Sequence, residues 1–340
     1  MRRDLYSFGT TIDLINRKYT EGEPFVFALD YEMQNGIFVC NPNQESDVLF
    51  RVHNITNSND SKRREAVSAA SLYKRALLDI TEKLSLEEYS VKFQKVADAL
   101  KIGDSYLVNL TCKTKVNSPL SLEQIFYCTG SPFGLYVAGL FVSFSPERFV
   151  KIEKGEISCT PMKGTIDASV PDALQTILNN YKESCEHNTI TDLIRNDLGI
   201  VCDNVWVERF RYAGTIKTDR GKILQISSDI RGKISESYLF KPGDLLAALL
   251  PAGSISGAPK PSTINIIREA EGEPRGFYTG IFGYFDGKTL DTAVLIRFIQ
   301  KDGDGSLWYR SGGGVTVNST CAEEYNEMVN KIYLPLIEMP

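Results

Sequence analysis

The sequence has little histidine and no paired-cysteine motif. Only His53 and His187 are present among 340 residues, which excludes a metal site built from several imidazoles. The seven cysteines are odd in number and scattered, and no CxxC pair occurs. This usage indicates reduced thiols in a cytoplasmic protein, and neither a disulfide framework nor a zinc site.

Long apolar runs and an excess of positive charge are also missing. No stretch approaches the ~20 apolar residues that a membrane span needs, and the basic N-terminus lacks the apolar core of a signal peptide. A net charge of −5 disfavours binding to nucleic acid. We therefore expect neither a membrane nor a nucleic acid as a partner. The 42% hydrophobic content is ample for a large core.

Periodicity and turn residues divide the chain into strands and helices without an internal repeat. Helices are predicted at 66–80, 85–100, 171–194 and 322–337, and on both sides of the loop 251–260. The second helix begins with the capping pair Ser85 and Glu88. Strands are predicted at 24–32, 36–40, 105–116, 134–145, 148–153, 156–160, 205–217, 223–234, 277–287, 292–300 and 306–317, and the polar stretch 53–64 predicts a mobile loop. Many antiparallel-looking strands without a βαβα alternation indicate the α+β class.

Two pairs of glutamates share a helical spacing. Glu183 and Glu186 are three residues apart on one predicted helix, and Glu324 and Glu327 repeat the spacing on the last. Each pair shares a helix face. Two such pairs facing one another would make an all-oxygen site for a hard cation such as Mg²⁺. The spacing by itself is more often that of a solvated helix face.

Three further side chains and a glycine run are candidates for chemistry. Lys163 is a nucleophile if burial lowers its pKa, and otherwise a turn lysine. Glu147 is a general acid if burial raises its pKa, and otherwise a loop carboxylate. Arg297, a charge inside an apolar segment, needs a partner such as a substrate carboxylate or a structural salt bridge. Gly312–Gly314 either brings N–H groups close to an anion or makes a tight strand connection.

The loop PAGSISGAPK (251–260) only superficially suggests a phosphate loop. It lacks the G-K-[ST] ending, and Pro259 removes a backbone donor. A non-catalytic nucleotide-binding protein is therefore the alternative from a different functional class, and it rests on the glycine loops alone.

Taken in order, these segments resemble the motifs of the chorismate-utilising enzymes. The motifs are SPERF (145–149), PMKGT (161–165), ExxEH with DLIRNDLG (183–199), PAGSISGAPK (251–260), FYTGIFGYF (277–285), IRF (296–298), SGGGV (311–315) and EYNEMVNK (324–331). The resemblance implies an α+β fold of two large antiparallel sheets packed face to face, with helices outside and the site in a cleft. Residues 104–340 would form the catalytic region. Residues 1–103 would be a trimmed part of the same domain, without a tryptophan pocket.

The resemblance also implies roles for individual residues. Lys163 would attack C2 of chorismate, and Glu147 would protonate the departing C4 hydroxyl. Mg²⁺ would be ligated by Glu186 and Glu327, with help from Glu183 and Glu324. The substrate would be bound by Arg297, Tyr278, Gly312, Gly313, Gly314, His187, Thr165, Ser256, Gly257 and Lys331.

Lysine at position 163 and the segment YLVNLT (106–111) resemble the residues at the corresponding positions of the aminodeoxychorismate synthases, one group within the family. Those enzymes convert chorismate and ammonia to 4-amino-4-deoxychorismate on the route to p-aminobenzoate and folate. No Cys-His-Glu glutaminase set is present, so a separate glutaminase subunit would supply ammonia and a separate lyase would act downstream. The alternatives within the family are component I of anthranilate synthase, whose members typically carry alanine at this position, and an isochorismate or salicylate synthase.

Overall fold

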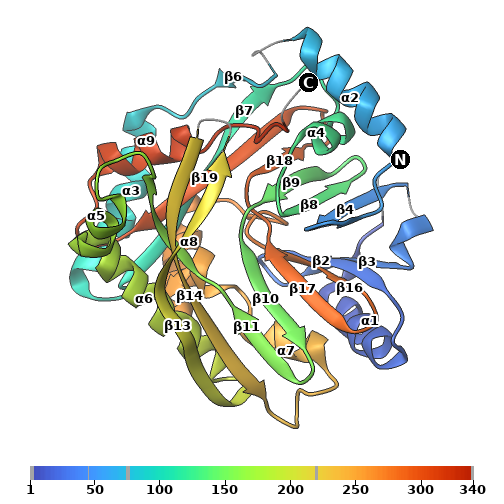
Figure 1. The fold of residues 1–340 in the computed structure, drawn as a ribbon. Helices are drawn as coiled ribbons and strands as arrows, with labels where there is room; N and C mark the ends of the chain where they lie inside the picture. The colour runs from blue at the N-terminus through green and yellow to red at the C-terminus, as the bar shows by residue number, and fades with distance from the viewer. Residues whose placement is uncertain (1–3, 45, 74–76, 219–220, 338–340) are drawn as a thin grey trace.

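The computed structural model describes residues 4–44, 46–73, 77–218 and 221–337, and their strands form two antiparallel sheets (Figure 1). Sheet 1 has the order β1 (Tyr6–Ser7), β3 (Asn35–Cys40), β2 (Phe25–Leu29), β16 (Ile281–Phe285), β17 (Thr289–Val294), β10 (Arg148–Glu153), β11 (Glu156–Cys159), β14 (Gly221–Ile234) and β12 (Met162–Asp167), with β13 (Cys202–Thr218) also paired to β14. Sheet 2 has the order β15 (Gly257–Ala258), β7 (Leu107–Asn117), β19 (Leu307–Val315), β18 (Phe298–Lys301), β9 (Phe141–Ser145), β8 (Phe133–Val137), β4 (Val48–Val52) and β5 (Ile55–Thr56), with β6 (Asp79–Glu82) also paired to β7.

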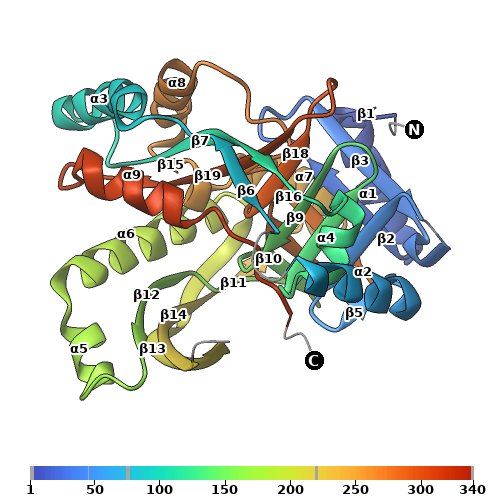
Figure 2. The ribbon, with the colours of Figure 1, turned by 90° about the horizontal axis from the view of Figure 1, so that it is seen from above.

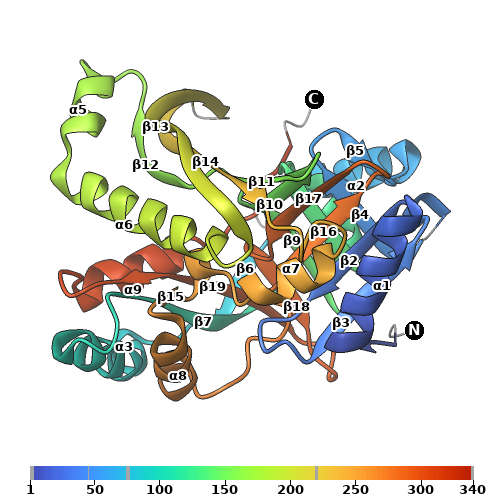
Figure 3. The ribbon, with the colours of Figure 1, turned by 90° about the horizontal axis from the view of Figure 1, so that it is seen from below.

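The sheets pack face to face and helices cover both outer faces, so the predicted α+β architecture is confirmed. Outside sheet 1 lie α1 (Phe8–Glu21), α6 (Tyr181–Leu198) and α7 (Pro242–Leu249), with α1 beside α7 in Figures 1 and 3. Outside sheet 2 lie α2 (Asp60–Leu72) and α4 (Leu122–Cys128) at one end, and α3 (Leu86–Ile102), α8 (Lys260–Glu271) and α9 (Cys321–Asn330) at the other (Figure 2).

Strand β2 shows how the sequence builds these layers. All five of its residues are buried. Phe25 and Phe27 point to the cluster that includes α1, while Val26 and Ala28 point to the core between the sheets. A strand covered on both faces reads as a continuous apolar run because successive side chains alternate between faces.

The polar stretch 53–64 is not a loop, and the prediction there was wrong. Ile55 and Thr56 pair with β4, and the side chain of Asn59 accepts hydrogen bonds from the N–H groups of Ser61 and Lys62. Asparagine is a favoured N-cap residue, so α2 begins at Asp60 and ends at Leu72. The capping box of Ser85 and Glu88 at the start of α3 is confirmed.

Two other helix predictions need correction. The helix predicted at 171–194 is two helices, α5 (Ala173–Asn179) and α6, because Asn180 caps a new start through the N–H of Glu183 at 3.1 Å. The last helix ends at Asn330, and the following segment bridges back to the chain at Thr129 through Leu336.

The expected cysteine state agrees with the structure. Cys40, Cys112, Cys128, Cys159, Cys185, Cys202 and Cys321 are all unpaired thiols. Among the helices that the structure describes, none is long and apolar enough to cross a membrane.

The chain crosses between the two sheets at two neighbouring connections. The chain leaves β9 in sheet 2 and enters β10 in sheet 1 through Pro146 and Glu147, and it leaves β17 in sheet 1 and enters β18 in sheet 2 through 295–297. The segment 292–300, predicted as one strand, is therefore broken at Arg297, whose φ is 52°. Such backbone strain in a non-glycine residue is held only where the surroundings fix it.

Candidate active site

A cavity of about 120 Å³ opens where the chain crosses between the sheets. Its lining includes the predicted site residues Glu147, Tyr278, Arg297, Gly312, Gly313, Gly314, Glu327 and Lys331. These residues come from the segments that connect the strands, from β19 of sheet 2, and from α9 and the residue that follows it, so the tertiary fold gathers motifs that lie far apart in the sequence.

The Arg297 side chain is poised for an anion. Its guanidinium lies over the Tyr333 ring, 5.2 Å from the ring centroid. In the described part of the chain, its Nε is buried and has no hydrogen-bond partner. Burial also raises the pKa of Tyr278 to about 12, so this phenol stays protonated at neutral pH and can donate a hydrogen bond. A carboxylate suits both donors.

The glycine run of β19 lets α9 approach the sheet. A Cβ at Gly313 would lie 3.0 Å from Glu327 Oε1 and 3.2 Å from Glu324 Oε2. Glu324 is buried and accepts a hydrogen bond from Ser319 Oγ at 2.7 Å. Lys331 Nζ donates to Glu327 Oε1 at 2.6 Å and to the carbonyl of Gly312 at 2.8 Å. The carboxylates of α9 are thus placed directly against the glycine backbone.

The second glutamate pair lies on α6 beside β12. Glu183 Oε2 would be 3.0 Å from a Cβ at Gly164, whose φ is 85°. Glu186 is half-buried one turn further along. This contact brings the helix against the strand that carries the PMKGT motif. The side chains of Lys163 and Thr165 lie outside the described part of the structure.

The chemical type of the predicted ligand atoms suits a hard divalent cation. Glu183, Glu186, Glu324 and Glu327 supply carboxylate oxygens, the ligands that Mg²⁺ prefers, and the space above Gly313 is a cradle that a Cβ would fill. No three carboxylate, imidazole or thiolate groups of the described residues are close enough together to hold a metal ion. The predicted magnesium site therefore stays a prediction.

Three predicted substrate contacts have other surroundings. His187 is fully buried, and its Nε2 lies 2.7 Å from Ser228 Oγ. Ser256 donates to the carbonyl of Ala252 at 2.7 Å, and Gly257 lies so close to the Leu107 carbonyl that a Cβ would overlap it. None of the three is among the residues that line the cavity. Their contacts brace α6 and the loop 251–260.

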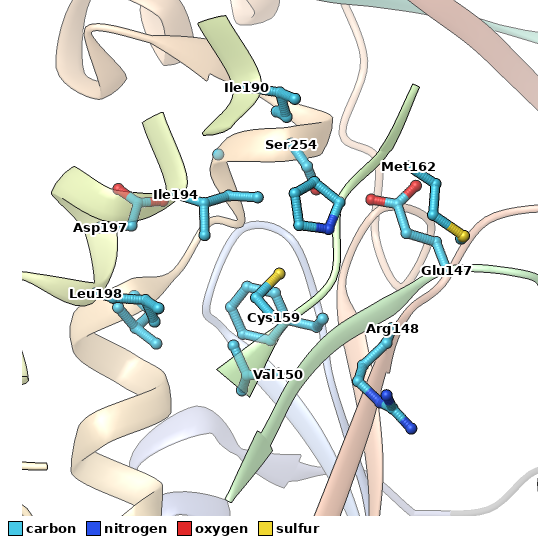
Figure 4. A pocket seen from close by; sticks show the side chains of 14 residues that line it. Glu147, Arg148, Val150, Cys159, Met162, Ile190, Ile194, Asp197, Leu198 and Ser254 are labelled. Carbon is cyan, nitrogen blue, oxygen red and sulfur yellow. The ribbon is translucent and has the colours of Figure 1, made fainter. Parts of the chain in front are cut away.

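A second cavity of about 60 Å³ adjoins the first and shares Glu147 and Ser254 with it. Figure 4 shows the Glu147 carboxylate at its rim, near Ser254 and Met162. The opposite wall is the apolar side of α6 and ends at Asp197. Burial raises the pKa of Asp197, and Lys260 opposes that shift from 3.0 Å.

Sequence reasoning missed several residues of the first cavity, including Asn109, Ser254, Thr279 and Arg310. Asn109 gave a usable signal, since it is a polar residue within the apolar run YLVNL. Thr279 gave none, because its left-handed backbone (φ 59°) becomes visible only in the fold.

Comparison with known proteins gives a family match and several kinds of relative, including an anthranilate synthase component 1 of Aquifex aeolicus that is 35% identical over 263 residues, covering 72% of this chain and 51% of its own length. The family described as chorismate binding enzyme matches residues 18–336. A Haemophilus influenzae protein named uncharacterized PabA-like protein is 44% identical over 327 residues, covering 96% of each chain. Aminodeoxychorismate synthase component 1 of Salmonella typhimurium is 33% identical over 273 residues, covering 73% of this chain and 57% of its own length.

Solved structures share the fold. Anthranilate synthase component I from Streptococcus pneumoniae superposes with a TM-score of 0.70 at 20% identity, covering 98% of this chain and 85% of its own. A Bacillus anthracis protein described as a putative 2,3-dihydroxybenzoate-specific isochorismate synthase, DhbC, gives 0.69 at 16% identity, covering 96% and 87%.

Proposed function

This chain belongs to the chorismate binding enzyme family, and on that premise we propose that it is the synthase component that aminates chorismate to 4-amino-4-deoxychorismate. The observation that carries the proposal is the single cavity that unites Glu147 with Arg297, Tyr278 and the glycine run. Lys163 in PMKGT selects the product, and the similarity to an aminodeoxychorismate synthase component 1 supports that choice.

Substrate binding follows from the donors of the cavity. Arg297 offers its planar fork to one carboxylate of chorismate, and its buried Nε has no hydrogen-bond partner among the residues that the structure describes. The protonated phenol of Tyr278 donates from the same wall. Gly312–Gly314 let the ring approach the backbone of β19 closely.

The two glutamate pairs would hold Mg²⁺, which supplies charge neutralisation for a substrate carboxylate when bound. Ser319 fixes the carboxylate of Glu324, and Lys331 fixes that of Glu327. The side chains are therefore oriented by neighbours before any ligand arrives, which favours binding.

The reaction proceeds as two displacements. The Lys163 amine bonds to C2 of chorismate, both ring double bonds shift (C1=C2 to C1=C6 and C5=C6 to C4=C5), and the C4 hydroxyl leaves as water with a proton from Glu147. Ammonia then bonds to C4, both double bonds return, the bond between C2 and Lys163 breaks so that the lysine leaves as its neutral amine, and the new C4 ammonium returns a proton to Glu147. The amine ends at the carbon that carried the hydroxyl. Covalent catalysis of this kind divides one difficult step into two.

Product analysis tests this function. The purified chain is incubated with Mg²⁺, ammonium and chorismate, and the products are identified by mass spectrometry and fluorescence. We expect 4-amino-4-deoxychorismate from the wild type, its loss or diversion to anthranilate in Lys163→Ala, and unchanged product in the control Lys154→Ala, on the β10–β11 turn. Anthranilate from the wild type would identify an anthranilate synthase, and isochorismate or salicylate formed without ammonium would identify the third alternative.

We further propose that a separate glutaminase subunit supplies the ammonia in the cell and that a separate lyase consumes the product. The support is the lack of a Cys-His-Glu glutaminase set in this sequence. The purified chain is expected to use ammonium and to leave glutamine intact. Glutamine hydrolysis by the chain alone would refute the need for such a partner.

A further inference from the structure

An outer cavity of about 410 Å³ lies outside the catalytic machinery described above. It is formed by Tyr31–Gln34 after β2, by one side of α8 and by the segment 271–275. Its rim carries the exposed side chains of Met33 and Arg268. The proposed reaction uses none of these residues, so the cavity needs a different explanation.

One side chain spans the wall between this outer cavity and the active-site cavity. Arg275 lines the outer cavity and is 2% exposed. Its Nη2 donates to the carbonyl of Asn109 at 2.6 Å, and its Nη1 donates to the carbonyl of Ile255 at 3.0 Å and to Thr279 Oγ1 at 3.3 Å. All three acceptors belong to residues that line the active-site cavity. The Arg275 guanidinium therefore reaches from the lining of the outer cavity to residues that line the inner one.

Glu271 holds that guanidinium in place. Its Oε1 accepts from Arg275 Nη2 at 2.6 Å and its Oε2 accepts from Arg275 Nε at 2.9 Å, which makes a bidentate pair. Glu271 Oε1 also accepts the N–H of Thr111 at 2.8 Å. The contacts within the pair are made by side chains, which can rearrange without a change in the backbone.

The charge changes sign across the wall. The outer cavity has three carboxylates, of Glu32, Glu271 and Glu273, against the guanidiniums of Arg268 and Arg275, whereas the inner cavity has three cations, Arg297, Arg310 and Lys331, against the carboxylates of Glu147 and Glu327. Arg310 also contacts the wall, since its Nη2 donates to the carbonyl of Pro274 at 3.1 Å. Carboxylates attract a small cation to the mouth, whereas guanidiniums ahead repel it unless it has lost its charge.

Two buried polar atoms flank the ion pair. Among the described residues, Tyr31 Oη and Thr111 Oγ1 are buried and have no hydrogen-bond partner, and the two residues are only 6% and 2% exposed. The Arg275 guanidinium lies 4.6 Å from the centroid of the Tyr31 ring. Such atoms are costly to leave unsatisfied, so they favour a small hydrogen-bonding molecule at the wall.

We propose that the outer cavity is the entrance for ammonia and that the Arg275–Glu271 pair gates its inner end. Ammonium gathers at the carboxylates, gives its proton to solvent water at the mouth, and continues past the guanidiniums as neutral ammonia. This inference rests on the proposed function, because only an aminating enzyme needs ammonia.

The experiment narrows the entrance without touching the wall or the active site. Ile264→Trp on α8 and Met33→Trp on the opposite rim each place an indole in the outer cavity. Ile266→Trp is the matched control, since it lies on the same helix, is half-buried like Ile264 and lines a different cavity. The initial rate of chorismate loss is measured against ammonium concentration and, separately, against chorismate concentration.

We expect both entrance variants to raise the KM for ammonium roughly fivefold or more while the KM for chorismate stays unchanged, because only access of the second substrate is reduced. The control should match the wild type. Thermal unfolding checks folding, and if Ile264→Trp does not fold, Met33→Trp decides, since Met33 is already 37% exposed.

The proposed route for ammonia would be refuted if the KM for ammonium were unchanged in the folded entrance variants. It would also be refuted if the KM for chorismate rose by the same factor as the KM for ammonium. Failure of the proposed function is seen separately, in the product of the wild type. Anthranilate would refute the proposed product but leave the need for ammonia, whereas chorismate loss that does not depend on ammonium would also remove the basis of the passage.

Discussion

Glu147 and Arg297 lie on adjacent chain segments that both cross from one sheet to the other. The carbonyl of Glu147 accepts the N–H of Val294 at 3.3 Å, and the carbonyl of Arg297 accepts the N–H of Phe144 at 3.1 Å. Main-chain hydrogen bonds therefore fix the spacing between the proposed acid and the proposed carboxylate ligand. Sites carried on such rigid elements hold their geometry better than sites on free loops.

Replacement of Arg297 tests the carboxylate contact. Arg297→Gln removes a charge-assisted, forked interaction of about 1.5–3 kcal/mol, so the KM for chorismate should rise roughly tenfold to hundredfold. Arg297→Lys should recover only part of the loss, because the point charge of lysine does not reproduce the fork. Steady-state kinetics measure both. Arg195→Gln, on the outer side of α6 with 49% of its side chain exposed, is the control, and an equal effect there would argue against a specific role.

Gly313→Ala tests the approach of α9 to the sheet. The added methyl would meet the carboxylates of Glu327 and Glu324 at 3.0 and 3.2 Å and would push them out of position. We expect a large loss of activity with a change in unfolding free energy of about 1 kcal/mol or less, since side-chain ends can move away. Gly303→Ala meets nothing within 4 Å and should behave as wild type. Full activity in Gly313→Ala would show that the cradle is not used.

Removal of metal tests the glutamate pairs. Chelation with EDTA should abolish activity, and added Mg²⁺ should restore it. Glu327→Gln should raise the Mg²⁺ concentration needed for half-maximal activity by about tenfold or more, because even the loss of a residue that merely orients a ligand weakens metal binding by that amount. Glu323→Gln is the control on the same helix, where the carboxylate binds Thr320 Oγ1. Activity that survives EDTA would refute a magnesium requirement.

Lys260→Met tests the link between α6 and the loop 251–260. It leaves the buried Asp197 carboxylate without its ammonium partner, which should lower the unfolding free energy by about 2–3 kcal/mol at pH 8. Burial already raises the pKa of Asp197 in the folded state, and the substitution raises it further. Asp197 then binds its proton more tightly in the folded protein than in the unfolded chain. The loss of unfolding free energy caused by Lys260→Met is therefore largest above the raised pKa, and it shrinks as the pH falls toward the ordinary pKa of aspartate.

Urea denaturation at pH 8 and pH 5 measures that trend, with Lys241→Met, at an exposed lysine, as the control. A loss of unfolding free energy that is the same at both pH values would indicate lost packing rather than a buried carboxylate without its partner.

Local features of the fold were predictable because short-range physics decides them. The Ser85 capping box, the strands β2 and β3, and the helical placement of both glutamate pairs depend on neighbours in sequence. The errors at 53–64 and 171–194 overlooked the local N-cap signals of Asn59 and Asn180. The error at 292–300 fell where a tertiary contact overrides a local pattern. The apolar run around Arg297 is a good strand by composition, but it is broken where the chain changes sheets.

The sequence by itself determined the types of side chain available for chemistry: two histidines, four suitably spaced glutamates, and an ordered set of motifs that identifies the family. Only the tertiary structure decided which of them share a cavity. It placed Glu147 beside Arg297, turned His187 toward Ser228, and set Arg275 between two cavities. The reason is that helix and strand periodicity is a property of adjacent residues, whereas these relationships depend on how two sheets and their helices pack across the whole chain.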